Sequence, residues 1–238
     1  MQVANPAFMP QSNLLWPPPP HQQRLEEQDI HVWAAGLDQS LERISVFRGT
    51  LAADELERAA RFHFERDHNR FIAGRGLLRE ILGSYLEIHP SQLDFQYSPR
   101  GKPMLKAASA LPPLHFNVGH SEDLILIALT TSCPVGIDLE RVRPIPELEN
   151  IARQYFSTRE ATDLMALPKD RQLRAFYQLW TRKEACLKAT GEGLSSSMRE
   201  IEATASWTLV ELAPAANFVA AIAAPIVDPS VSCWVWLS

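Results

Sequence analysis

The sequence predicts an α+β fold that consists of two similar halves. Strand-like, helical and again strand-like segments follow one another in that order, and the same order occurs twice along the chain. The 238 residues are 46% hydrophobic, which is enough apolar material to bury a sizeable core. We expect the halves to meet near 131–134, so that an N-terminal half covers 29–132 and a C-terminal half covers 133–238.

Residues 1–28 are expected to form a separate N-terminal arm. This segment is rich in Pro, Gln and Asn, and its four consecutive prolines, Pro17–Pro20, favour a polyproline II conformation. We expect Leu14, Leu15 and Trp16 to pin the arm to the body of the protein. The alternative is a peptide ligand for a proline-binding module.

The first half begins with the strand-like run DIHVWAAGLD at 29–38. Two helices are expected within 51–90, because apolar residues recur there at helical spacing. The segment 93–105 reads as two short strands joined by a Pro/Gly turn. Two further β-rich runs, 123–130 and 133–142, are separated by a short linker, and we expect them to form an antiparallel hairpin.

The second half continues with helices and ends with strands. Helical patterns cover 147–156, 157–167 and 170–191. Ser157 followed by Glu160 has the spacing of a capping box, and Gly191 is expected to stop the last helix. Strands are expected at 206–212, 218–224 and 232–237.

Composition narrows the classes of function. The net charge of −5 argues against a broad nucleic-acid surface. The three cysteines are far apart and form no C-x-x-C, which disfavours a disulfide framework or a zinc site and favours a reducing, cytoplasmic setting. No apolar run reaches the roughly 20 residues that a membrane helix needs, so we expect no membrane partner.

The first candidate site is VGIDLE at 135–140. Residues two apart in a strand share a face, so Asp138 and Glu140 point to one side while Ile137 and Leu139 face the core. Two adjacent carboxylates repel unless a cation joins them, and Mg²⁺ prefers such oxygen ligands together with phosphate oxygens. The alternative is a solvated acidic strand end.

The second candidate site is WTRKEACLK at 180–188. On a helix, Glu184 and Lys188 are neighbours at i, i+4. They could form a surface ion pair worth about 0.3–0.5 kcal/mol. Alternatively, Glu184 is a metal ligand or a base, and Lys183 and Lys188 bind phosphate.

The third candidate site is FNVGHSED at 116–123, which we expect to be a loop. His120 can donate to a phosphate oxygen, and Ser121 and the backbone at Gly119 offer further donors. The turn SPRGKP could present Lys102 to an anion. In both segments the alternative is a purely local role. Neither a phosphate-binding G-x-x-x-x-G-K-[ST] nor a G-x-S-x-G elbow occurs in the sequence.

Taken together, these motifs resemble the 4'-phosphopantetheinyl transferases of the surfactin-type class. The family pattern is F-N-x-S-H-S, then (I/V)-G-(I/V)-D-(I/L/V)-E, then W-x-x-K-E-(A/S)-x-x-K. The chain has FNVGHS at 116–121, VGIDLE at 135–140 and WTRKEACLK at 180–188, in the same order and preceded by GKP at 101–103. The resemblance covers about Ile30 to the end of the sequence.

The resemblance implies a monomer whose halves are related by a pseudo-twofold axis, with the active site between them. Such enzymes move the 4'-phosphopantetheine of coenzyme A onto a serine of an apo acyl or peptidyl carrier protein. The pathway, whether fatty acid, polyketide or nonribosomal peptide synthesis, stays open. Asp138, Glu140 and Glu184 would hold Mg²⁺, with Mn²⁺ as an alternative. Glu184 would also act as the base, and Lys188 would stabilise the leaving phosphate.

Further positions follow from the same motifs. Cofactor-binding residues implied for coenzyme A are Arg58, Arg70, Lys102, His120, Lys183 and Lys188, with the two arginines at the 3'-phosphate. Glu160 matches a further acidic position. The carrier protein is expected to dock along Ile145–Leu167, although the apolar residues there could equally belong to the core.

One departure from the pattern is Gly119, where the family has serine. It predicts weaker coenzyme A binding, with extra room where the serine side chain would be. A catalytically weak homologue that binds coenzyme A or a carrier protein is therefore an alternative. An Mg²⁺-dependent hydrolase of phosphoanhydrides is another.

Overall fold

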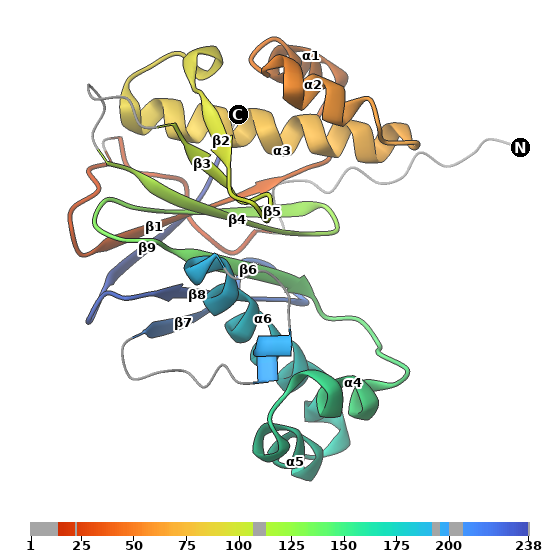
Figure 1. The fold of residues 1–238 in the computed structure, drawn as a ribbon. Coiled ribbons are helices and arrows are strands. Elements are labelled where there is room, and N and C mark those ends of the chain that lie inside the picture. Colours follow the sequence, from red (N-terminus) through yellow and green to blue (C-terminus); the bar gives the residue numbers. More distant parts are fainter. Residues whose placement is uncertain (1–13, 22, 107–112, 192–195, 200–206, 238) are drawn as a thin grey trace, which may run out of the picture.

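The computed structural model describes residues 14–21, 23–106, 113–191, 196–199 and 207–237. Four layers follow one another in Figure 1: a group of helices, a sheet, a second sheet and another group of helices. The first sheet has the strand order β4-β5-β1-β9 and the second has the order β6-β8-β7, while β2 and β3 form a small separate ribbon. The predicted α+β class is confirmed.

The helices of the N-terminal half pack on one face of the first sheet (Figure 1). The elements are β1 (Asp29–Gly36), α1 (Leu41–Arg48), α2 (Ala53–Ala59), α3 (Glu65–Leu86), β2 (Phe95–Tyr97), β3 (Pro103–Leu105), β4 (His115–Ser121) and β5 (Leu124–Thr130). Helix α1 is absent from the sequence-based expectation. It buries only Ile44 and Phe47, so its apolar pattern is weak, and its clearest signal is the cap at Ser40, whose side chain accepts from Arg43 N.

The central strands of the first sheet, β1 and β5, are buried on both faces. In β1, Val32 and Ala34 belong to the core between the two sheets, whereas Trp33 packs with helix α3. In β5, Leu126 belongs to the core between the two sheets, and Ile127 belongs to the core beneath the N-terminal helices. This alternation with a period of two explains why these strands read as continuous apolar runs in the sequence.

The second half places three helices outside the second sheet (Figure 1). Its elements are β6 (Gly136–Arg141), α4 (Leu148–Tyr155), α5 (Thr158–Ala166), α6 (Lys169–Thr190), the short 3₁₀ helix η3 (Ser196–Arg199), β7 (Thr208–Leu212), β8 (Phe218–Ala224) and β9 (Ser230–Val235). The capping box of Ser157 and Glu160 is confirmed. Gly191 ends α6 with φ 78°, as a left-handed helix stop requires, while Gly193 lies outside the described residues.

The expected hairpin of β5 and β6 is wrong. Strand β5 pairs with β4 and β1, and β6 pairs antiparallel with β8 in the other sheet. Both strands are buried on their two faces, and each has hydrogen-bonding partners within its own sheet. The segment 131–135 carries the chain from one layer to the next.

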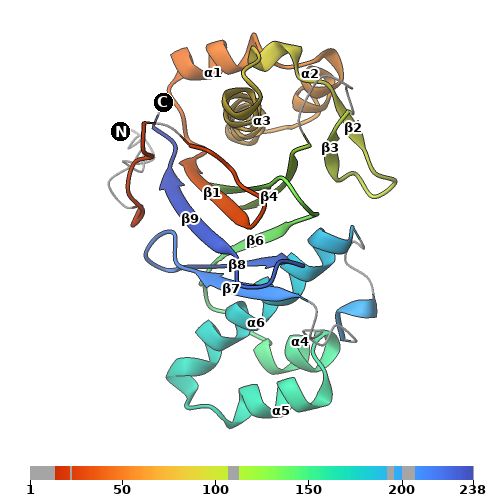
Figure 2. The ribbon, with the colours of Figure 1, turned by 90° about the vertical axis from the view of Figure 1, so that its left-hand side faces the viewer.

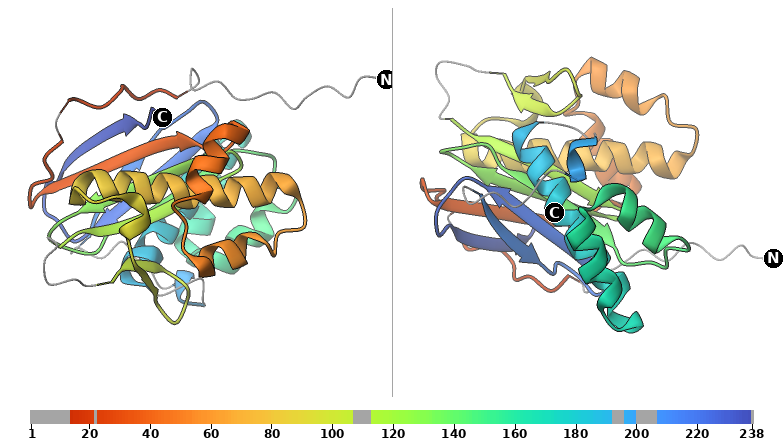
Figure 3. Two further views of the ribbon diagram at one scale, coloured as in Figure 1. Left: turned by 90° about the horizontal axis from the view of Figure 1, so that it is seen from above. Right: turned by 60° about the horizontal axis from the view of Figure 1, so that its bottom comes forward.

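The C-terminal strand returns to the first half. Strand β9 pairs in parallel with β1, from Asp29 opposite Ser230 to Ala34 opposite Val235, and Figures 2 and 3 show it beside β1 rather than in the second sheet. The two halves of the predicted division thus share a sheet. In the described part of the arm, Leu14 bridges to Ala215 and Trp16 packs on the core between the sheets, whereas Leu15 is exposed.

Helix length and hydropathy decide whether a helix can span a membrane. Among the described residues, no helix is long and apolar enough to cross a bilayer.

Candidate functional site

A close approach between α6 and β6 builds the site. Gly136 begins β6 directly under the helix, and a Cβ atom at this position would lie 1.9 Å from the carbonyl oxygen of Ala185. Glycine is therefore required for the helix to pack on the strand. As a result, Glu184 and Lys188 on α6 lie beside Asp138 on β6.

Lys188 reaches across this junction to Asp138. Its Nζ lies 2.7 Å from Asp138 Oδ1 and donates to the carbonyl oxygen of Ile137 at 3.2 Å. The helical neighbour Glu184 is not its ion-pair partner in the described structure, so the surface-pair interpretation of the Glu184 and Lys188 spacing is wrong. Asp138 and Glu184 are both buried, at 6% and 7% exposure.

The three carboxyl groups influence one another electrostatically. Burial and the negative charges of Asp138 and Glu140, opposed by Lys188, together raise the pKa of Glu184 to about 7. Burial also raises the pKa of Asp138, against the attraction of Lys188. The pKa of Glu140 is raised by burial and by Asp138, while the Ser121 hydrogen bond opposes the rise. Crowded carboxylates of this kind favour a bound cation.

The orphaned oxygens at this junction fit a divalent cation. Asp138 Oδ2 and Glu184 Oε1 are buried and lack a hydrogen-bond partner among the described residues, which is costly for a carboxylate. In the described part of the chain, no group of three or more His, Cys, Asp or Glu side chains has the spacing of a finished metal site, and Lys188 holds one oxygen of Asp138. Oxygen donors of this type are those that Mg²⁺ prefers.

The segment FNVGHS is a strand rather than the expected loop. It forms β4, which pairs with β5 through its whole length. Its other side meets β6 from the second sheet: Asn117 Oδ1 accepts from Ile137 N at 2.9 Å, and Ser121 Oγ donates to Glu140 Oε2 at 2.9 Å. The hydroxyl of Ser121 is therefore engaged by a carboxylate in this structure.

The room expected at Gly119 is not there. This glycine is buried, and a Cβ atom would lie 3.0 Å from Ile137 O and 3.2 Å from Asp138 Cα, tighter than most such contacts. The expectation fails because β4 and β6 belong to different sheets whose backbones meet at this point.

A pocket of 410 Å³ next to β4 gathers the basic residues. It brings Arg58, Arg70 and His120 together with Gly101 of the β2–β3 turn and Pro103 at the start of β3. Three of the predicted cofactor-binding residues thus line one cavity. A third arginine, Arg75, also lines it, and the sequence motifs did not single out this residue.

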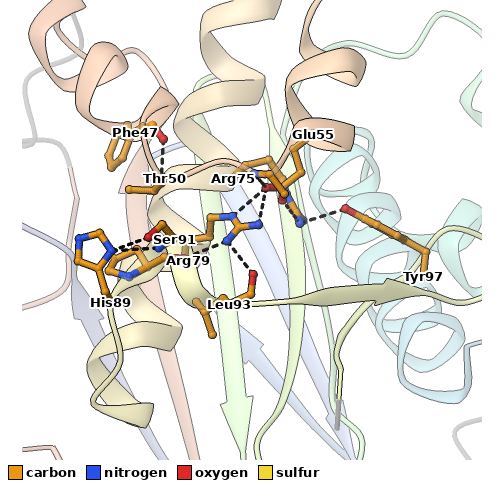
Figure 4. A network of polar contacts seen from close by, with 11 residues as sticks. Phe47, Thr50, Glu55, Arg75, Arg79, His89, Ser91, Leu93 and Tyr97 are labelled. Atoms are coloured by element: carbon orange, nitrogen blue, oxygen red, sulfur yellow. Dashed lines mark hydrogen bonds and ion pairs between the residues drawn. The ribbon is translucent and has the colours of Figure 1, made fainter. Parts of the chain in front are cut away.

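Two arginines of this pocket are held by carboxylates. Arg70 makes a bidentate pair with Asp38, at 2.6 and 2.8 Å. Arg75 pairs with Glu55, which is almost fully buried and also pairs with Arg79 at 2.6 Å (Figure 4). The pairing of Arg70 with both oxygens of Asp38 restricts its guanidinium to one orientation, while Arg75 is held through one oxygen of Glu55.

His120 lines the same pocket. Its side chain is exposed there, yet the surrounding protein hinders hydration of the imidazolium. This desolvation, with the charge of Lys188, lowers the pKa of His120, and Asp138 partly opposes it. The histidine is therefore positioned near both the carboxylate junction and the arginines.

Lys102 lies at the end of α6. Its Nζ donates to the carbonyl oxygen of Lys188, and burial together with the charge of Lys188 lowers the pKa of Lys102. It borders a second cavity, of 720 Å³, whose wall also includes Met104, Phe116 and Thr190.

Lys183 lies neither at the junction of α6 and β6 nor in the pocket lined by the arginines. It is 3% exposed and forms an ion pair with Glu160 at 2.9 Å, and it donates to the carbonyl oxygen of Met198. In the expected docking segment, Phe156 and Leu164 are buried in the core beside α6, while Tyr155 and Met165 pack against that core. The core interpretation therefore holds for Phe156 and Leu164.

Comparison with known proteins identifies related sequences along most of the chain. A model of the 4'-phosphopantetheinyl transferase superfamily matches residues 134–215, and a model of the N-terminal part of 4'-phosphopantetheinyl transferases matches residues 38–132. The 4'-phosphopantetheinyl transferase HetI of Nostoc sp. is 41% identical over 220 residues, which cover 87% of this chain and 92% of the relative.

Two other relatives match shorter stretches. The 4'-phosphopantetheinyl transferase Sfp of Bacillus subtilis is 36% identical over 63% of this chain and 64% of its own length. The human L-aminoadipate-semialdehyde dehydrogenase-phosphopantetheinyl transferase is 30% identical over 64% of this chain and 52% of its own length. Given the match to HetI over nearly its full length, the chain belongs to the 4'-phosphopantetheinyl transferase superfamily, in its Sfp-type class.

Proposed function

We propose that this protein transfers the 4'-phosphopantetheine of coenzyme A to a serine of an apo acyl or peptidyl carrier protein. The observation that carries the proposal is the junction of α6 and β6, where Glu184, Asp138 and Lys188 meet next to a pocket lined by arginines and His120. Carboxylates that favour a cation and cations that favour phosphate are the groups that a pyrophosphate substrate requires.

The reaction exchanges one phosphorus–oxygen bond for another. The serine oxygen forms a bond to the phosphorus that carries pantetheine, and the bridging bond of the pyrophosphate breaks. Adenosine 3',5'-bisphosphate leaves, and the serine proton passes to Glu184. Without a cation the pKa of Glu184 is about 7, which makes it more basic than an ordinary carboxylate; a bound cation would lower this pKa, so its position beside the serine then matters most.

Each remaining group at the junction has a role in this scheme. Asp138, Glu140 and Glu184 would hold Mg²⁺ or Mn²⁺, which neutralises charge on the pyrophosphate oxygens when bound. Lys188, already at the junction, stabilises the charge that develops on the leaving phosphate. Lys183 acts through Glu160 on the packing of α6 rather than on phosphate.

The arginine pocket would take the nucleotide end of coenzyme A. Arg58, Arg70 and Arg75 supply positive charge for the 3'-phosphate, and His120 donates to phosphate between this pocket and the carboxylates. Lys102 is the further cation that we assign to the phosphates. The 720 Å³ cavity beside it has apolar and polar walls that suit the amphipathic pantetheine arm.

All residues in this scheme come from one chain, so a monomer can carry out the reaction. Coenzyme A and a carrier protein are the partners that it needs. We place it in the cytoplasm because the scattered thiols fit a reducing compartment, and we assign it no nucleic-acid or membrane partner.

The test is to incubate the protein with coenzyme A, Mg²⁺ and several apo carrier proteins, and to weigh the carriers by mass spectrometry. We expect a carrier to gain the mass of one phosphopantetheine, and Glu184→Gln to abolish the gain without unfolding the protein. Coenzyme A binding without any gain on any carrier would favour the catalytically weak homologue. Release of adenosine 3',5'-bisphosphate without a carrier would favour the hydrolase.

A further inference from the structure

Ser121 joins the end of β4 to the carboxylate of Glu140. Its hydroxyl donates to Glu140 Oε2 at 2.9 Å and accepts from the backbone N–H of Arg141 at 3.1 Å. A hydroxyl has a single proton, and the N–H of Arg141 already occupies one of its lone pairs. The proton is therefore directed to Glu140, and both partners of Ser121 lie on β6.

Ser121 itself is held by the strand that carries it. Asn117 lies on the same face of β4, four residues earlier, and its Oδ1 accepts from Ile137 N at 2.9 Å in a buried environment. Gly119 lies between them and lets the two backbones approach closely. Strands β4 and β6 belong to different sheets and are not paired by backbone hydrogen bonds. Side chains of β4 make the hydrogen bonds that connect the two strands.

The hydrogen bond from Ser121 restricts the side chain of Glu140. This side chain is only partly buried, so without a partner it would lose rotamer freedom each time it bound a cation. The Ser121 hydrogen bond engages Oε2 and leaves Oε1 for a metal. Groups that orient metal ligands in this way commonly contribute 10–100-fold to metal affinity.

We propose that Ser121 is a positioning residue that holds Glu140 ready for the divalent cation. The proposal rests on the proposed function, because it requires the cation site of Asp138, Glu140 and Glu184. It differs from the sequence-based interpretation, in which Ser121 was a phosphate donor.

The experiment measures Mn²⁺ affinity directly rather than through turnover. Free Mn²⁺ is followed by electron paramagnetic resonance during a titration of the full chain with coenzyme A present, and a protein-free sample corrects for Mn²⁺ bound by coenzyme A. We expect Ser121→Ala to weaken Mn²⁺ binding by about 10–100-fold. Ser121→Thr retains the hydroxyl and should bind nearly as tightly as the wild type. Ser84→Ala is the matched control, because that hydroxyl donates only to Ile81 O within α3.

Three outcomes would overturn the proposal, each in a different way. If the wild type binds no Mn²⁺, the cation site of the proposed function fails as well. If Asp138→Asn abolishes binding while Ser121→Ala leaves it unchanged, the cation site stands and the role of Ser121 does not. If Asn117→Ala weakens binding as much as Ser121→Ala, the effect comes from a loosened β4–β6 contact and not from the hydroxyl.

Discussion

Lys188 Nζ lies 2.7 Å from Asp138 Oδ1, across the junction between α6 and β6. The lysine thereby occupies one carboxylate oxygen and leaves Asp138 Oδ2 and Glu184 Oε1 as buried acceptors without partners among the described residues. If the proposed function holds, a polyanionic substrate would draw the lysine to phosphate, and Asp138 would then be free to hold the cation. Under the proposed function, this ion pair is the arrangement of the site before substrate and cation bind.

The first prediction concerns Lys188. Replacing it by Met should lower kcat for holo-carrier formation by about a hundredfold or more, because a preorganised charge at the leaving phosphate is lost. Steady-state kinetics with one carrier protein measure the effect. Lys169→Met at the start of α6 is the matched control and should retain activity. An unchanged kcat for Lys188→Met would remove the lysine from the mechanism.

The second prediction concerns the glycine beneath α6. Gly136→Ala places a methyl group 1.9 Å from Ala185 O, so the helix must move away from β6, and overpacking of this kind costs about 1–3 kcal/mol or more. We expect a lower urea midpoint and a loss of transfer activity. Gly36→Ala is the control, since nothing lies within 4 Å of its Cβ. Equal stability of the two variants would contradict the close approach.

The third prediction separates packing from hydrogen bonding at Gly119. Gly119→Ala and Gly119→Ser add the same Cβ atom against Ile137 O, so both should lose about 1–3 kcal/mol of stability. The variants differ by one hydroxyl. If that group binds phosphate, the KM for coenzyme A should be about twofold to tenfold lower for Ser than for Ala. Identical KM values would show that the missing serine does not explain coenzyme A affinity.

The fourth prediction concerns the arginine pocket. Arg75→Lys keeps the charge but loses the fork that Glu55 orients, so the KM for coenzyme A should rise about tenfold, equivalent to about 1.4 kcal/mol. The KM for dephospho-coenzyme A, which lacks the 3'-phosphate, should change little. Arg153→Lys on α4, whose partner is Glu149 at the surface, should alter neither value. A parallel rise for both substrates would place the 3'-phosphate elsewhere.

The fifth prediction concerns a buried histidine outside the site. His31 is 4% exposed, its Nδ1 lies 2.7 Å from Tyr85 Oη, and its closest acidic group is Asp29 at 4.0 Å. Burial lowers the pKa of His31, against the attraction of Asp29. The unfolded chain therefore binds the proton first, at about pH 6.5, and stability falls as the pH drops below that value, by up to about 1.4 kcal/mol per pH unit.

Urea unfolding at pH 7.5 and 5.5 measures this dependence. Other histidines also titrate in this range, so the informative quantity is the difference between the wild type and His31→Gln. The variant should lose less stability on acidification. An equal loss in both proteins would exclude His31 as the source.

The sequence predicted the residues of the candidate site better than it predicted the pairing of the strands. Asp138, Glu184 and Lys188 could be identified because short motifs restrict residue type at each position, and the structure brings these side chains together. The partners of β5 and β6 could not be predicted, because both strands are apolar runs and local spacing does not reveal which sheet each strand joins. Arg75 was missed because its role depends on Glu55, a partner from another helix.

The parallel pairing of β9 with β1 also has a consequence for biosynthesis. These strands come from opposite ends of the sequence, so during translation β1 leaves the ribosome long before its neighbour exists. Until β9 is released from the ribosome, other contacts or a chaperone must cover the unpaired edge of β1. The first sheet can therefore be completed only after β9 has left the ribosome, and a nascent chain arrested before β9 should remain sensitive to protease around β1.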